Sequence, residues 1–161
     1  MRAIIQRVSE ASVSINGKMS GNIGRGFLVL LGIVDGDGQE EIDWLVGKIT
    51  RMRIFADEEG KMNRCLKEVD GELLVVSQFT LHASTKKGNR PSFIKAARPE
   101  TAIPLYEAFL KAAEKETGRA PESGEFGADM QVSLITDHSV AKINLPGGKF
   151  LRRKEKRLFI S

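Results

Sequence analysis

The sequence is poor in the residues that build covalent or metal-bound frameworks. Its 161 residues include one cysteine, Cys65, and two histidines, His82 and His138. These counts exclude a disulfide framework, a cysteine-rich zinc site and any iron–sulfur cluster. We therefore expect neither a metal nor a cofactor.

Long hydrophobic runs are also missing. No apolar run approaches the roughly 18 residues that a membrane-spanning helix requires. Residues 1–7 become polar too early for a signal peptide. We therefore expect a cytoplasmic protein with no membrane partner.

The surplus of positive charge is small and uneven. Lysine and arginine number 25 against 21 acidic residues, a net charge of +4. This surplus permits an anionic partner but does not require one. Because six basic residues and one acidic residue follow Leu145, residues 1–145 hold 19 basic and 20 acidic residues. We predict a single domain over 1–145 and a basic C-terminal tail over 146–161, which either binds the phosphates of a nucleic acid or is a solvated extension.

Hydrophobic patterning predicts several strands and two helices. The predicted strands are 3–8, 11–15, 27–34, 53–55, 72–81, 130–135 and 140–145. The run 27–34 is apolar throughout, which indicates a central strand buried on both faces. One helix carries an apolar stripe from 42 to 52, and a second begins near Pro99 or, because of Pro104, somewhat later. The pattern predicts an α+β fold in a single domain: a barrel-like or curved sheet with two helices packed on it.

Common catalytic motifs are missing as well. The sequence has no Walker loop, no His-Glu-x-x-His and no nucleophile elbow. Asp137, His138 and Ser139 are the three residue types of a hydrolytic triad. Adjacent residues on a strand point to opposite faces, so these three cannot form that relay among themselves.

Residues 77–80 are the first candidate site. Here a hydrophobic strand ends in Ser77, Gln78, Phe79 and Thr80. Small polar groups at a strand end, together with backbone N–H groups that leave the sheet, can hold a carbonyl oxygen or orient a water molecule. The alternative is that the two hydroxyls cap the strand and the phenylalanine is core. His82 adds a weak signal for a general base.

A basic loop follows this strand end. It contains Lys86, Lys87 and Arg90, with Gly88 between them, and Phe93 shortly after. Three cations with a flexible glycine and a nearby aromatic ring can clamp phosphates and stack a base. The alternative is an ordinary solvated loop.

Four segments together resemble the D-aminoacyl-tRNA deacylase family, formerly called D-tyrosyl-tRNA deacylase. They are residues 1–8, 75–81, 86–93 and 126–130. They occur in the family's order and spacing over residues 1–137.

The resemblance implies a cytoplasmic homodimer that edits aminoacyl-tRNA. Such an enzyme hydrolyses the ester between a D-amino acid, or glycine mischarged on tRNA(Ala), and the 3′-terminal adenosine, releasing free amino acid and tRNA. An aminoacyl ester is already activated. Orienting water and polarising the carbonyl can therefore suffice without a metal.

The resemblance also implies roles for particular residues. The catalytic strand end comprises Ser77, Gln78, Phe79 and Thr80, with Thr80 either assisting water or only positioning the substrate. The adenosine pocket comprises Phe126, Gly127 and Met130. The tRNA acceptor end would meet Lys86, Lys87 and Arg90, and Arg7 resembles the arginine that supports the chirality loop of the other subunit.

One signature of the family is altered. The family's Asn-x-Gly-Pro-Val-Thr should fall at 136–141, where this chain has Thr-Asp-His-Ser-Val-Ala. In the family, the glycine and the cis-proline reach across the dimer and present carbonyl groups to the substrate's amino group, which excludes L-amino acids. His138 and Ser139 replace them, and a cis bond before a residue other than proline costs about 2.5–4 kcal/mol.

Several interpretations follow from this departure. They are a deacylase with altered chirality control, a deacylase-like paralogue that binds charged tRNA but hydrolyses it weakly, and a C-terminus altered by a reading-frame error. A structural or small-molecule-binding β-barrel is a further alternative. Because every family element before Asp137 is intact, we favour the deacylase.

Overall fold

The computed structural model describes residues 1–86, 88–144 and 158–160, and the side chains of 1–86 and 88–136. Lys87 and most of the predicted tail, 146–161, lie outside the described residues. In the described residues, no helix is long and apolar enough to span a membrane.

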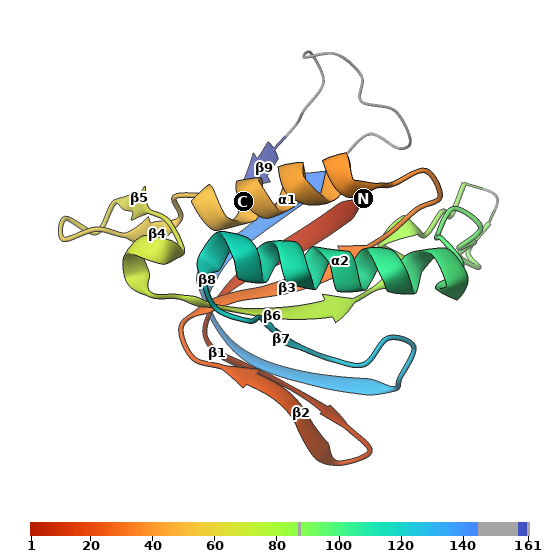
Figure 1. Cartoon of the computed structure of the whole chain (residues 1–161), viewed down its shortest axis with the longest axis horizontal. Helices are drawn as coiled ribbons and strands as arrows, with labels where there is room; N and C mark the ends of the chain where they lie inside the picture. The colour runs from red at the N-terminus through yellow and green to blue at the C-terminus, as the bar shows by residue number, and fades with distance from the viewer. Residues whose placement is uncertain (87, 145–157, 161) are drawn as a thin grey trace.

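Seven strands of the described residues form one mixed sheet in the order β7-β6-β3-β1-β8-β9, with β2 paired to β1 (Figure 1). The strands are β1 (Arg2–Ile15), β2 (Lys18–Ile23), β3 (Gly26–Gly32), β6 (Glu72–Ser77), β7 (Glu122–Ser123), β8 (Met130–Asn144) and β9 (Leu158–Ile160). β6 pairs parallel with β3 and with β7, and the other pairs are antiparallel. A separate hairpin joins β4 (Phe55–Ala56) to β5 (Met62–Arg64).

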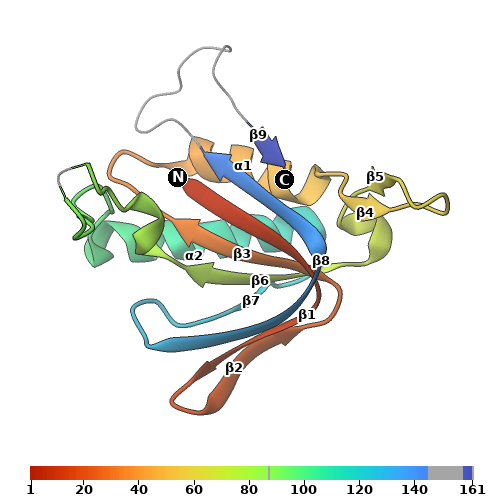
Figure 2. The ribbon, with the colours of Figure 1, turned by 180° about the vertical axis from the view of Figure 1, so that it is seen from behind.

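Two long strands give the sheet its curvature (Figure 2). The first half of β1 pairs with β3 and its second half with β2, while β8 pairs with β1 along both halves. Irregularities in the β1–β8 register bend both strands, so the sheet becomes nearly closed and barrel-like. Asn16 and Gly17 form the turn between β1 and β2, with φ angles of 51° and 76°.

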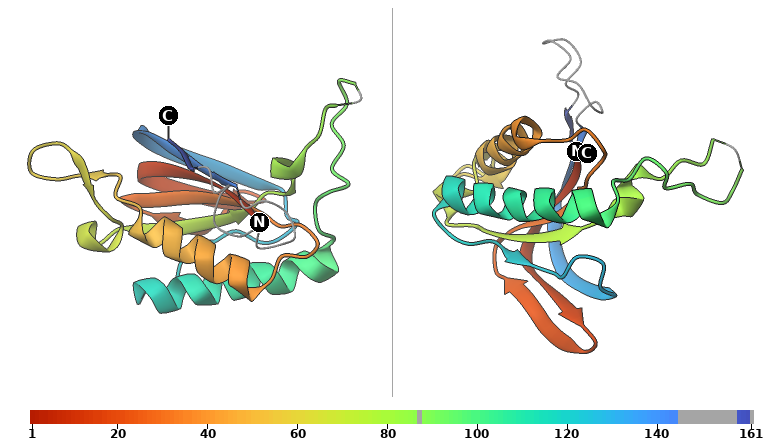
Figure 3. Two further views of the ribbon diagram at one scale, coloured as in Figure 1. Left: turned by 90° about the horizontal axis from the view of Figure 1, so that it is seen from above. Right: turned by 45° about the vertical axis from the view of Figure 1, so that its right-hand side comes forward.

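Helices α1 (Gln39–Arg51) and α2 (Pro99–Thr117) lie side by side on one face of the sheet (Figure 3). Residues from α1 such as Leu45, and from α2 such as Phe109, pack against Ile5 and Phe27 of the sheet. Leu28 faces the concave side, where the second core lies. β3 is therefore central and buried on both faces, as predicted, and the predicted fold class of a curved sheet with two helices is confirmed.

Several predicted boundaries were wrong. Residues 3–8 and 11–15 belong to one strand, β1, and residues 130–135 and 140–145 were wrongly separated, because β8 runs unbroken to Asn144. Each long strand is the continuous partner of the other, and bulges absorb the polar residues between the apolar runs.

The strand predicted over 72–81 ends at Ser77, and a short 3₁₀ helix, η2 (Phe79–His82), follows it. A second 3₁₀ helix, η1 (Lys67–Val69), precedes β6. Pro104 does not delay α2, which begins at Pro99. Pro104 therefore lies inside the helix, where it lacks the N–H that would donate to the Glu100 carbonyl, and α2 forms without that hydrogen bond.

Candidate functional site

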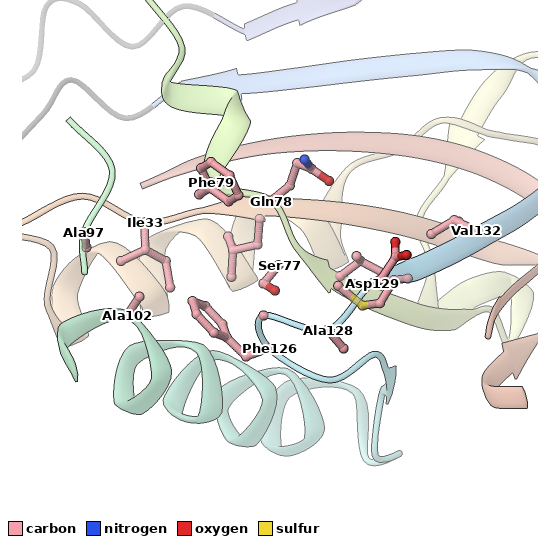
Figure 4. Close-up of a pocket in the computed structure, with 14 residues that line it drawn as sticks. Ile33, Ser77, Gln78, Phe79, Ala97, Ala102, Phe126, Ala128, Asp129 and Val132 are labelled. Atoms are coloured by element: carbon pink, nitrogen blue, oxygen red, sulfur yellow. The ribbon is translucent and has the colours of Figure 1, made fainter. Parts of the chain in front are cut away.

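A pocket of about 290 Å³ opens where β6 ends, between the start of α2 and the turn that precedes β8 (Figure 4). Six of the predicted site residues line it: Ser77, Gln78, Phe79, Phe126, Gly127 and Met130. Small and aliphatic side chains such as Ile33, Ala97 and Ala102 form the rest of its inner wall. The structure thus brings the two predicted halves of the site, 77–80 and 126–130, to one cavity.

The polar residues lie where β6 ends and the chain leaves the sheet. Ser77 is paired with Leu31 of β3, and the N–H of Gln78 donates to the Leu31 carbonyl at 2.7 Å. The chain then leaves the sheet for η2, whose turn is closed by the Ala83 N–H donating to the Thr80 carbonyl at 3.0 Å. The Arg2 guanidinium also donates to the Leu81 carbonyl, which ties η2 to β1.

Thr80 contacts a pocket residue without lining the pocket. Its hydroxyl oxygen accepts a hydrogen bond from the side-chain amide of Gln78, and Thr80 itself is not among the residues that line the cavity. The arrangement orients the Gln78 amide at the pocket. The structure therefore places three of the four predicted catalytic residues on the cavity and the fourth in contact with one of them.

A tight turn presents Phe126 and Met130. The Ala128 N–H donates to the Glu125 carbonyl at 3.3 Å, and Gly127 takes a φ of 79°, which residues with a side chain rarely adopt. Met130 packs over Gly124, where an added Cβ would lie 2.2 Å from the Met130 Sδ. Gly127 is thus needed for the backbone path of this turn, whereas a side chain at Gly124 would displace the Met130 side chain from the wall.

Tyr106 ties that wall to the sheet. Its ring packs against Phe126 with 6.0 Å between centroids, and its hydroxyl donates to the Val75 carbonyl at 2.8 Å. Burial raises the pKa of Tyr106 to about 12. The phenol is therefore a neutral donor that holds α2, the Phe126 wall and β6 together.

His82 does not face the pocket. It is buried at the end of η2, and burial lowers the pKa of its imidazole below the usual value. Its Nε2 has no hydrogen-bond partner within the described residues, and His82 is not among the residues that line the cavity. The side chain packs η2 against Gly32, away from the residues that line the cavity.

The basic loop, residues 84–93, stands beside the pocket. Ser84 and Ser92 exchange two backbone hydrogen bonds of 2.9 Å, and Lys86 and Arg90 are exposed between them. The ring of Phe93 meets the ring of Phe79 edge to face, with 5.2 Å between centroids. The loop therefore joins the pocket through an aromatic contact.

Arg7 lies away from the pocket of its own chain. Its guanidinium donates to the Ile54 carbonyl and stands 6.0 Å from the centre of the Phe55 ring. Arg7 pairs with Phe27, which pairs with Leu73, four residues before Ser77. That offset is about 13 Å along the strands.

The altered signature lies next to Arg7. In the pairing of β1 with β8, Gln6 lies opposite Val140 and Val8 lies opposite Thr136. The three residues 137–139 of β8 therefore lie opposite the single residue Arg7 of β1. His138 and Ser139 belong to this bulge. The structure thus groups the predicted chirality position with Arg7 and separates both from the pocket.

Sequence reasoning assigned no role to Asp129. Among the described residues that line the pocket, Asp129 is the only acidic one (Figure 4). The sequence could have pointed to Asp129, because it lies inside segment 126–130, which resembles the family. Ala97, Ala102 and Ala128 also line the cavity, and small apolar residues carry no sequence signal for a site.

Comparisons with known proteins show which family this chain is similar to. A family model described as D-Tyr-tRNA(Tyr) deacylase matches residues 4–143, a span that includes the altered signature. The D-aminoacyl-tRNA deacylases of Flavobacterium johnsoniae and Bacteroides thetaiotaomicron are 61% and 57% identical over 140 residues, which cover 87% of this chain and 93% of each relative.

Solved structures are also similar. The structure titled c-Myc DNA Unwinding Element Binding Protein superposes with a TM-score of 0.85 and 39% identity, over 91% of this chain and 100% of the other. A probable eukaryotic D-amino acid tRNA deacylase shares the fold, with a TM-score of 0.71 and 20% identity over 84% of this chain and 94% of the other. The chain therefore belongs to the D-Tyr-tRNA(Tyr) deacylase family, which confirms the family and the enzyme class predicted from its sequence.

Proposed function

We propose that this chain hydrolyses the ester bond of D-aminoacyl-tRNA in the cytoplasm, and that of glycyl-tRNA mischarged on tRNA(Ala), releasing free amino acid and tRNA. The observation that carries this proposal is the single cavity that six of the predicted site residues line. Its volume, about 290 Å³, lies near the lower end of the range for small-molecule sites, which suits one nucleoside. Phe126, Gly127 and Met130 take the adenosine.

The end of β6 acts on the ester. The first N–H groups of a 3₁₀ helix have no partner inside the helix, so those at the start of η2 polarise the carbonyl oxygen. A water molecule then attacks the carbonyl carbon, the bond to the ribose oxygen breaks, and that oxygen takes a proton. Gln78 and Ser77 orient the reacting groups, and no side chain bonds covalently to the substrate.

We assign Thr80 a positioning role. Its hydroxyl accepts the hydrogen bond from Gln78, and Thr80 is not among the residues that line the pocket. A hydroxyl in that place fixes the amide of Gln78, and the amide in turn meets the substrate. This choice favours one of the two roles that the sequence left open.

Asp129 meets the substrate's amino group. The α-ammonium group is the cationic part of an aminoacyl ester, and Asp129 is the only acidic side chain among the described residues that line the pocket. This chain has His138 and Ser139 at the positions where the family has the glycine and proline that hold the amino group. A carboxylate at the pocket supplies complementary charge without them.

The pocket is completed by a second copy of the chain. His138 lies six residues beyond Val132, a pocket residue, which is about 20 Å along β8. The position that controls chirality in the family can therefore reach a pocket most directly in the other copy, with Arg7 beneath it. We propose a homodimer in which the acceptor end of tRNA meets Lys86, Lys87 and Arg90.

A second candidate function is the binding of charged tRNA with little hydrolysis. The observation that favours it is the replacement of the glycine and proline by His138 and Ser139, inside the region that matches the family. In that case the pocket would retain charged tRNA while its amino acid stayed attached.

Incubation with D-Tyr-tRNA and with L-Tyr-tRNA, both in the presence of a chelator, separates these functions. Release of D-tyrosine supports the deacylase, and release from both substrates shows in addition that chirality control is lost. Tight binding of D-Tyr-tRNA without release supports the second candidate. If the protein neither binds D-Tyr-tRNA nor releases D-tyrosine from it, both functions are contradicted.

A further inference from the structure

Phe79 is a large apolar side chain that the fold leaves open to solvent. It exposes 57% of its surface, although residues 73–76 of the preceding strand β6 are buried. Its ring meets Phe93 edge to face, at 5.2 Å between centroids and an interplanar angle of 81°. Two aromatic rings held together at a surface, next to a pocket, are characteristic of a binding site.

The fold holds Phe93 from both sides. On one side, the two hydrogen bonds between Ser84 and Ser92 close the basic loop immediately before it. On the other side, the Ala96 N–H donates to the Phe93 carbonyl at 2.9 Å, and the Ala97 N–H donates to the Ile33 carbonyl at 2.9 Å. The backbone at Phe93 is therefore held in place and its ring rests against Phe79 before any ligand binds, which lowers the entropic cost of binding.

Phe79 connects this surface to the cavity. Phe79 lines the pocket and also contacts Phe93 outside it. A chain attached to a nucleoside in the pocket can leave it past these rings, because Phe79 forms part of the lining. Lys86 and Arg90 lie exposed in the adjoining loop, where they supply positive charge for a phosphate backbone.

We propose that Phe79 and Phe93 form a stacking platform for the base of the nucleotide that precedes the terminal adenosine of the substrate. The proposal rests on the proposed function and adds a second nucleotide subsite to it. Stacking on an aromatic ring is tolerant of base identity, because every base has a π-face. The platform therefore recognises a single-stranded 3′ end and not a particular sequence.

The test compares a long and a minimal substrate with the variant Phe93→Ala. The substrates are D-tyrosyl-tRNA and D-tyrosyl-adenosine, which lacks the preceding nucleotide. Loss of one base–aromatic stack is expected to lower kcat/KM for the tRNA by about 5- to 150-fold and to leave the adenosine ester within about twofold. Phe93→Tyr keeps an aromatic ring and should stay close to wild type on both substrates.

Ile94→Ala is the matched control, since Ile94 is the next residue and exposes 91% of its surface. It should leave both substrates unaffected. An equal loss on both substrates for Phe93→Ala would mean that Phe93 only supports the fold and would overturn the platform. So would no loss on either substrate.

Equilibrium binding separates failure of the platform from failure of the proposed function. The wild-type protein should bind the trinucleotide CCA more tightly than adenosine, and Phe93→Ala should remove that difference. If the wild type hydrolyses neither ester but shows this preference, the platform is supported and the deacylase activity is contradicted. If CCA and adenosine bind the wild type equally, the platform is overturned.

Discussion

Gln78 donates a hydrogen bond from its Nε2 to the Oγ1 of Thr80, two residues further along the chain. The bond spans the point where β6 becomes η2, so it fixes the side chain of Gln78 relative to the end of the sheet. Gln78 lines the pocket and Thr80 does not. In our proposal, Gln78 meets the substrate and Thr80 holds the Gln78 amide in place.

Replacement of Thr80 tests this division. Thr80→Val removes the acceptor of one hydrogen bond, which is worth about 0.5–1.5 kcal/mol, so kcat is expected to fall about 2- to 10-fold. Thr80→Ser keeps the hydroxyl and should release D-tyrosine at close to the wild-type rate. The measurement is single-turnover release of D-tyrosine from D-Tyr-tRNA. A loss of about 10²- to 10⁴-fold in Thr80→Val would instead indicate a proton-transfer role and would contradict our assignment.

Asp129→Asn should weaken recognition of the amino group. Asp129 is exposed at the pocket, so solvent screens its charge and kcat/KM for D-Tyr-tRNA is expected to fall only about 2- to 5-fold. The same variant should hydrolyse N-acetyl-D-Tyr-tRNA, which carries no ammonium group, at the wild-type rate. An equal loss on both substrates would show that Asp129 shapes the pocket and does not recognise the charge.

Restoring the family signature should restore discrimination. The double variant His138→Gly/Ser139→Pro restores the residue pair with which the family presents two backbone carbonyl groups to the amino group of the substrate. A hydrogen bond to a charged group is worth about 1.5–3 kcal/mol, so the ratio of D-Tyr-tRNA to L-Tyr-tRNA hydrolysis should rise about 10- to 150-fold. His138→Gly alone is the control and should change the ratio little. An unchanged ratio in the double variant would mean that this bulge does not control chirality.

Tyr106 gives a prediction that absorbance can check directly, because it is the only tyrosine in the chain. Burial raises its pKa to about 12, whereas an unfolded tyrosine ionises near its ordinary value of 10.0. Above pH 10 the unfolded state therefore releases a proton that the folded state keeps, so stability falls as pH rises from 10 towards 12. Spectrophotometric titration of the folded protein should show no phenolate below pH 11.

In Tyr106→Phe, this alkaline loss of stability should disappear, and unfolding at neutral pH should cost about 1 kcal/mol less than in wild type. A native protein whose tyrosine ionises near pH 10 would contradict the buried bond to the Val75 carbonyl.

Local hydrophobic patterns predicted the elements that are buried either on both faces or along one regular face. The run 27–34 is apolar on both faces because β3 lies between the helices and the concave core, and the stripe that begins at Ile42 forms α1 because one face packs on the sheet. The end of β6 was misjudged, since Gln78, Phe79 and Thr80 continue an extended-looking pattern. Pairing with β3 stops there because β3 itself ends at Gly32.

The site could be predicted only where its residues lie in recognisable segments. Ser77 and Phe126 come from such segments, but their meeting in one cavity depends on β7, a two-residue strand that gave no sequence signal. Ala97 and Ala102 form the inner wall through the packing of α2 on the sheet, a long-range property. The continuity of β8 through Asp137 was likewise decided by its partner β1 and not by its own sequence.

The most direct test of the account is the release of D-tyrosine from D-Tyr-tRNA by the wild-type protein and by Ala128→Trp, both in a chelator. Ala128 lines the pocket, so a tryptophan there should fill the cavity and abolish binding of the terminal adenosine while the thermal unfolding midpoint stays close to that of wild type. We predict release by the wild type and none by the variant. No release by the wild type, or equal release by both proteins, would contradict the conclusion that the pocket at the end of β6 is the site of hydrolysis.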